Sequence, residues 1–255
     1  MNRVRQRIAT GATAAGVIVF SASPVVVEVI AAAGLDFVIL DMEHSALDMR
    51  DAAHLIRAAD AASLTAFVRV PGPDRALITR LLDLGASGIV LPHANYASCC
   101  ELANALRYAP EGGRGACQIT RAAGYTRGDW SAYAARANEE VMAIALIEDA
   151  ATLQDIDRMA ALPGIDAYFI GPTDLSIALG IPGATFDEPA LGAALERVIA
   201  AARRHDKSVM TLLAQPPDLA YGTRLVERGV SMLVLGTDAD LLTHSLLALR
   251  GVRDY

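Results

Sequence analysis

The sequence predicts a (β/α)8 barrel, and two patterns carry this prediction. Eight short apolar runs rich in Val, Ile and Leu recur along the chain, and they are continuous rather than alternating. Such runs are typical of parallel strands that are buried on both faces. Segments rich in Ala and Leu lie between most of these runs and have the composition of helices. Strand and helix alternating eight times close most economically into a barrel; a doubly wound open sheet is the alternative.

The expected elements follow directly from this alternation. The strands are expected at 16–20, 36–41, 65–70, 88–93, 141–148, 167–172, 208–213 and 232–237. The helices are expected at 24–33, 48–61, 74–84, 96–108, 152–161, 187–204, 216–228 and 238–249. Helix-start signals support several of them, such as Ser23 followed by Pro24. Three glycines stand between a helix and the next strand, where a left-handed cap is wanted: Gly34, Gly85 and Gly229.

The chain length suits one domain, residues 1–255, because barrels of this kind commonly run to roughly 250 residues. One long stretch, 109–129, shows neither strand nor helix patterning and is rich in Gly and Arg. A loop of this length in a compact domain usually serves a function or is disordered. No composition shift marks a second domain.

Charge and cysteine content limit the classes of partner and the compartment. The formal net charge is −7 and the pI is about 5.2, so nucleic acid, which needs a basic footprint, is not expected as a partner. No segment has the ~20 uninterrupted apolar residues of a membrane span. The three cysteines, Cys99, Cys100 and Cys117, form neither a disulfide framework nor a CxxC zinc motif. We interpret them as reduced thiols of a cytoplasmic protein.

Polar and ionisable residues gather where the expected strands end, which is the rim that carries the chemistry in barrel enzymes. A buried charge is costly unless it is paired, hydrogen-bonded or bound to a metal, so this concentration is a functional signal. The residues at these strand ends are Asp41 to His44, Arg69, His93, Glu148 and Asp149, Gly171 to Asp174, and Asp238.

Glu148 and Asp174 follow consecutive strands, so their carboxylates can converge on one point. Two carboxylates together with water and substrate oxygens suit a hard cation such as Mg²⁺, or Mn²⁺. Each residue also has an ordinary explanation. Glu148 could pair with an arginine, and Asp174 could cap the helix that begins near Leu175.

His44 is the candidate proton-transfer group, since histidine titrates near neutral pH. The alternative is a structural histidine held by Asp48. His93 has a similar position and is the weaker candidate. Asp83 stands at the end of an expected helix, and its position alone does not mark it as catalytic.

Arg69 ends the third expected strand, and its planar guanidinium suits a substrate carboxylate. The alternative is a structural ion pair with Asp41 or Glu43. The backbone of Gly112–Gly115 could surround an anion, but it lacks the spacing of a P-loop or a dinucleotide fingerprint.

Taken together, these segments resemble the HpcH/HpaI aldolase and citrate lyase family. The similarity runs from about residue 16 to 240 in the same order, and the combination is far more specific than any single part. The segments that carry it are DFVILDMEH (36–44), VRVP (68–71), LDLG (82–85), GIVLP (88–92), RYAP (107–110), GGRG (112–115), IE (147–148) and GPTDLSIALG (171–180).

The resemblance implies a class II, metal-dependent aldolase on a barrel. It implies that Glu148 and Asp174 bind Mg²⁺ or Mn²⁺, with Co²⁺ as a further candidate, and that the metal chelates pyruvate or a related 2-oxo acid. It implies that Arg69 holds this substrate, and that His44, with Asp83 behind it, relays the proton. The backbone from Gly171 through Pro172 to Thr173 would receive the substrate carboxylate. The partners implied are a 2-oxo acid, an aldehyde and further copies of the chain, in a hexamer or another trimer-based assembly.

Two departures from the family pattern leave the substrate open. Leu146 stands where typical pyruvate aldolases of the family carry Gln, and Ile18 lies in a first strand that often has Trp. Cleavage of a 4-hydroxy-2-oxo acid is the leading function. Condensation of oxaloacetate with an acetyl donor to form citrate is the second, and a non-catalytic, metabolite-binding barrel is the third.

Overall fold

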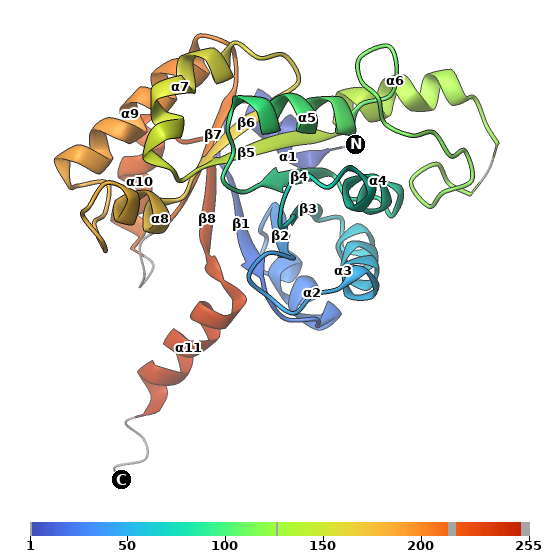
Figure 1. Cartoon of the computed structure of the whole chain (residues 1–255). Helices are drawn as coiled ribbons and strands as arrows, with labels where there is room; N and C mark the ends of the chain where they lie inside the picture. The colour runs from blue at the N-terminus through green and yellow to red at the C-terminus, as the bar shows by residue number, and fades with distance from the viewer. Residues whose placement is uncertain (1, 126, 214–217, 251–255) are drawn as a thin grey trace.

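The computed structural model describes residues 2–125, 127–213 and 218–250. Its eight strands are all parallel, and each pairs with its neighbours in chain order until β8 closes onto β1. Helices surround this sheet on the outside (Figure 1). The predicted (β/α)8 barrel is therefore confirmed, and the open doubly wound sheet is wrong.

Every predicted strand is present, with ends that differ by a few residues. The strands are β1 (Ala14–Val19), β2 (Phe37–Asp41), β3 (Thr65–Arg69), β4 (Gly88–Leu91), β5 (Met142–Ile147), β6 (Ala167–Ile170), β7 (Ser208–Leu212) and β8 (Met232–Thr237).

The predicted helices are also present, although residues 216 and 217 of the expected 216–228 helix lie outside the described residues. They are α2 (Pro24–Ala32), α3 (Met49–Ala61), α4 (Arg75–Asp83), α5 (Tyr96–Leu106), α7 (Ala150–Ala160), α9 (Pro189–Arg203), α10 (Leu219–Arg228) and α11 (Asp238–Leu249).

Three further helices were not predicted: α1 (Arg3–Ala9), α6 (Trp130–Glu140) and α8 (Pro172–Ala178). Two of them have only seven residues, which is too short for a clear helical period. The third follows the irregular 109–129 segment and leads back into β5 (Figure 1). α5 ends earlier than expected because Arg107 is extended, with its guanidinium bound to the Gly164 carbonyl and to Asp166.

Two apolar cores hold the barrel together. One fills the space inside the strands with side chains such as Phe37, Phe67 and Leu146, and Val4 of α1 closes it at the amino ends of the strands. The other lies between the strands and the surrounding helices. At the amino end of β4, Gly88 leaves room for the Met142 carbonyl.

The register of the sheet places the expected functional residues side by side. Asp41 at the end of β2 lies opposite Arg69 at the end of β3. Ile147 lies opposite Ile170, so Glu148 and Gly171, which follow them, emerge together. The carboxyl ends of four strands thus present polar residues at one rim.

The last helix, α11, is exceptional because none of its described residues is buried. It projects from the end of β8 away from the barrel (Figure 1). Leu242, Leu246 and Leu249 are more than half exposed along it. No helix in the described ranges is long and apolar enough to cross a membrane.

We expect Gly88→Ala to lower the free energy of unfolding by about 1–3 kcal/mol or more. The added methyl would lie 2.3 Å from the Met142 carbonyl oxygen and 3.0 Å from the Phe67 ring, so strand or ring must shift. Urea denaturation would measure the change. Gly72→Ala is the matched control, because its methyl meets no atom within 4 Å. Equal stability of the two variants would contradict this account of the β4–β5 packing.

Candidate active site at the carboxyl ends of the strands

Arg69 is anchored by a buried carboxylate on the neighbouring strand. Its Nε and Nη2 donate to Oδ1 and Oδ2 of Asp41 at 3.0 and 2.5 Å, a bidentate arrangement. Its Nε also lies 3.3 Å from Oε2 of Glu43. Burial lowers the pKa of Arg69, but hydrogen bonding and the charge of Asp41 more than offset this, so the pKa is raised. The ion pair that the sequence left as an alternative is therefore present, and it fixes the guanidinium at the rim.

Asp41 also shapes the turn that carries His44. Besides Arg69, its Oδ1 accepts the backbone N–H groups of Glu43 at 2.9 Å and His44 at 3.3 Å. The Ser45 hydroxyl donates to the Asp41 carbonyl oxygen. One fully buried carboxylate thus holds both the arginine and the histidine-bearing turn.

His44 stands free to meet a ligand. Its side chain is 58% exposed, and Nε2 lies 3.6 Å from Oε2 of Glu43. Asp48 instead caps α3 through the backbone N–H groups of Arg50 and Asp51, so it does not hold the imidazole. Glu43 therefore links His44 with Arg69. Burial raises the pKa of Glu43, against the lowering effect of Arg69 and His44.

Glu148 lies directly after β5 and is only 5% exposed. Its Oε1 accepts the backbone N–H of His93 at 2.6 Å. Burial raises its pKa; the His93 hydrogen bond and charge oppose this, and the charges of Glu43 and Asp174 add to it. Among the described ion pairs, none joins Glu148 to an arginine, so the arginine pairing considered as an alternative is not observed.

Gly171 is the N-terminal cap residue of α8, and Pro172, Thr173 and Asp174 form the first turn of this helix. A methyl on Gly171 would lie 3.3 Å from Oε2 of Glu148, so this backbone passes close to the carboxylate. Asp174 is exposed and does not cap the helix, because Gly171 occupies the cap position. Glu148 and the start of α8 thus lie close together, and the convergence of the Glu148 and Asp174 carboxylates on one cation stays a prediction.

This arrangement suits a cation held by two protein carboxylates. In the described part of the chain, no three His, Cys, Asp or Glu side chains are grouped to enclose a metal ion by themselves. Mg²⁺ commonly takes only one or two carboxylates and completes its shell with water and substrate oxygens. A buried carboxylate whose ionised form is disfavoured by burial and by Asp174 gains most from a nearby cation.

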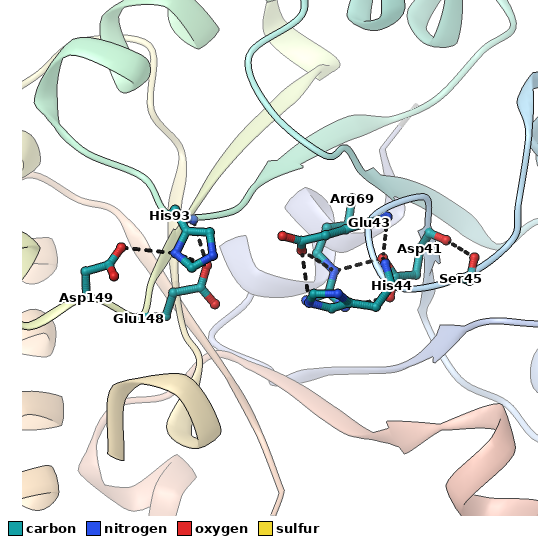
Figure 2. A network of polar contacts seen from close by, with 8 residues as sticks. All are labelled: Asp41, Glu43, His44, Ser45, Arg69, His93, Glu148 and Asp149. Carbon is teal, nitrogen blue, oxygen red and sulfur yellow. Dashed lines mark hydrogen bonds and ion pairs between the residues drawn. The ribbon is translucent and has the colours of Figure 1, made fainter. Parts of the chain in front are cut away.

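His93 makes a closer contact with Glu148 than its sequence position suggested. Its Nδ1 lies 3.2 Å from Oδ2 of Asp149 and 3.5 Å from Oε1 of Glu148. Its backbone is left-handed, with φ at 45°, which is uncommon outside glycine and turns the N–H toward Glu148. Figure 2 shows this group beside the group formed by Arg69, Glu43 and His44. The one sequence signal for it was its place after β4.

Asp83 lies away from the residues at the carboxyl ends of the strands. It is the last residue of α4, which returns from the functional rim toward the amino ends of the strands, and it pairs with Arg114 at 3.0 Å. Within one chain the structure does not bring Asp83 to His44. A role for Asp83 behind His44 stays a prediction.

Comparison with known proteins agrees with this architecture. A family model described as HpcH/HpaI aldolase/citrate lyase matches residues 14–245. A hydroxypyruvate/pyruvate aldolase of Pseudomonas aeruginosa is 33% identical over 253 residues, covering 98% of this chain and 92% of that protein.

Two solved structures are similar over nearly their whole length. An HpcH/HpaI aldolase from Desulfitobacterium hafniense DCB-2 has a TM-score of 0.90 and 32% identity, covering 98% of this chain and 96% of that one. The citrate synthase SbnG has a TM-score of 0.87 and 30% identity over the same shares. The named relatives support an aldolase or lyase activity. With the barrel and the match across its length, this chain belongs to the HpcH/HpaI aldolase/citrate lyase family.

Proposed function

We propose that the chain is a class II aldolase that cleaves a 4-hydroxy-2-oxo acid into pyruvate, or a related 2-oxo acid, and an aldehyde. The grouping of Arg69, His44 and Glu148 at the carboxyl ends of β2, β3 and β5 carries this proposal. Arg69 is paired with the carboxylates of Asp41 and Glu43, while the imidazole of His44 is more than half exposed. A cationic fork, a proton carrier and a carboxylate pair are the groups that this cleavage needs.

In the proposed reaction, the bond between C3 and C4 of the substrate breaks. His44 accepts the proton of the 4-hydroxyl group, so C4 leaves as the aldehyde carbonyl. The bond electrons pass to C3 and the 2-oxo group, and protonation at C3 then gives the 2-oxo acid. Arg69 binds the substrate oxygens and stabilises the negative charge that develops there.

Glu148 and Asp174 would hold a divalent cation, with Mg²⁺ and Mn²⁺ first and Co²⁺ as a further candidate. When bound, this cation supplies Lewis-acid stabilisation of the negative charge on the substrate oxygens. The backbone from Gly171 to Thr173 would receive the substrate carboxylate, since it lies beside Glu148.

We expect the purified protein to release pyruvate from a 4-hydroxy-2-oxo acid only when Mg²⁺ or Mn²⁺ is present. Glu148→Gln should lower the rate at least about a hundredfold, because a neutral amide binds the cation poorly and leaves the developing charge unbalanced. A coupled assay for pyruvate, with and without EDTA, measures both effects.

The matched control is Glu139→Gln, an exposed position on α6. The metal-induced rise in melting temperature should be kept in Glu139→Gln and lost in Glu148→Gln. Pyruvate release that persists in EDTA, or in Glu148→Gln, would rule out the metal-dependent mechanism.

We expect Asp41→Asn to lower kcat/KM about a hundredfold through displacement of Arg69. The amide keeps the shape of the carboxylate but cannot accept both guanidinium N–H bonds, and it removes the partner charge of a buried arginine. Steady-state kinetics measure this loss, and urea denaturation should show a stability loss of about 1–3 kcal/mol. Asp155→Asn on the exposed face of α7 should change neither value. Normal kinetics in Asp41→Asn would mean that Arg69 is not positioned by this pair.

A second candidate function is condensation of oxaloacetate with an acetyl donor to give citrate. The similarity to the citrate synthase SbnG favours it, since the two chains match over nearly their whole length. Leu146, which is buried inside the barrel, leaves the choice open because it replaces an amide with an apolar side chain. Citrate formation without pyruvate release would place this function first.

We further propose that the chain is a cytoplasmic homo-oligomer, either a hexamer or another trimer-based assembly. The three thiols are free, which suits a reducing compartment. The apolar residues of α11 support association, because an isolated helix with exposed leucines gains stability when a second copy covers it.

We expect light scattering after gel filtration to give a mass several times the 26.8 kDa of one chain. The double variant Leu242→Gln with Leu246→Gln should shift the population toward smaller species, since it removes apolar area from α11. Leu219→Gln on α10 is the control, because this leucine is 86% exposed but lies on another helix. A monomeric wild type would contradict the assembly.

A further inference from the structure

A large cavity lies at the opposite end of the barrel from Arg69 and Glu148. Its volume is about 930 Å³. Ser63, Ser87 and Val141, which precede β3, β4 and β5 closely, form its floor, and α6 and the segment 121–125 form its sides. It therefore belongs to the amino ends of the strands and is separate from the rim described above.

Positive charge dominates the walls of this cavity, although the chain as a whole carries a net charge of −7. Four arginines and two carboxylates line it, and Asp83 pairs with one of these arginines, so one positive charge is in excess. These residues are Arg3, Arg114, Arg121, Arg136, Asp60 and Glu140.

Arg114 is the residue that points most directly to a ligand. It is 7% exposed, its Nη2 binds Asp83 at 3.0 Å, and its guanidinium lies 4.5 Å from the centre of the Tyr108 ring. Its Nε is buried and has no hydrogen-bond partner within the described structure. A buried charged donor without a partner is costly, so such a group normally meets an acceptor.

The wall of the cavity holds the guanidinium group of Arg121 in a defined place. Its Nη2 lies 2.6 Å from Oδ2 of Asp60, and its Nη1 donates to the Leu84 carbonyl at 2.9 Å. Gly85 has φ at +102°, and a methyl there would lie 2.6 Å from Nη1 of Arg121. The arginine can take this place only because residue 85 has no side chain.

We propose that this cavity binds a small molecule with several negative charges, either a phosphate ester or a di- or tricarboxylate. The guanidinium fork matches both groups, and the volume lies within the range of sites for small metabolites. Ser63 and Ser87 supply hydroxyl groups beside the arginines. This binding is independent of the proposed aldolase reaction and lies beyond it.

The chain contains a single tryptophan, which can report binding at this place. The ring centroid of Trp130 lies 4.8 Å from that of Tyr108 and 5.4 Å from that of Tyr133. Tyr108 carries the guanidinium of Arg114, and Tyr133 lines the cavity. An anion that draws Arg114 toward itself therefore changes the surroundings of the indole.

The test is a titration of the full-length protein with inorganic phosphate and, separately, with citrate, at constant ionic strength and with tryptophan fluorescence as the readout. We expect a saturable change with at least one anion. A response to phosphate identifies the phosphoryl group as the ligand chemistry, and a response to citrate identifies carboxylates. The change should persist in Arg69→Lys, because Arg69 lies at the other rim.

Arg114→Lys should weaken binding about tenfold or more, because it removes a charge-assisted hydrogen bond while keeping the charge. Arg136→Gln provides a variant at an exposed position, where folding is not at risk, and should weaken binding severalfold. Arg127→Gln is the matched control, an exposed arginine that does not line the cavity. No saturable change with either anion, or equal weakening by Arg127→Gln and Arg136→Gln, would overturn the proposal.

Discussion

The closed register of eight parallel strands is the constraint on which the rest of this structure depends. Because every strand runs in the same direction, all carboxyl ends meet at one rim and all amino ends at the other. Asp41 then lies opposite Arg69, and Glu148 emerges beside Gly171. Residues far apart in the chain, such as His93 and Glu148, thereby become neighbours.

The rim concentrates charge that the barrel must stabilise. Arg69 is nearly buried, and Asp41 offsets its desolvation with two hydrogen bonds. Glu148 is also buried, but its described positive or hydrogen-bonding contacts are the backbone N–H of His93 and the His93 ring, and the charges of Glu43 and Asp174 oppose its ionisation. The positive charge of Arg69 is compensated inside the protein, and this residue helps to position other groups. The negative charge of Glu148 stays poorly compensated, which suits a bound cation.

The two ends of the barrel differ in the sign of the charge that predominates there. At the carboxyl ends, carboxylates outnumber the single arginine around the site. At the amino ends, arginines outnumber carboxylates around a cavity built from α6 and the irregular segment before it. Asp83 belongs to this second region through its pair with Arg114. The same fold thus separates a rim richer in carboxylates from one richer in arginines, with the apolar barrel core between them.

The sequence by itself determined the barrel, its eight strands and the rim positions of Arg69, His44 and Glu148. The apolar runs of the strands and the polar residues that follow them are local properties of the chain. It did not show α6, the contact between His93 and Glu148 or the separation of Asp83 from His44 within one chain. These features depend on which way a backbone turns after a strand and on where a helix ends in space. The arginine cavity likewise needed the tertiary structure, since its walls come from several separate segments between Asn2 and Val141. The pattern of strands and helices is a local property of the sequence, whereas side chains that are distant in the chain come together only when the sheet has closed.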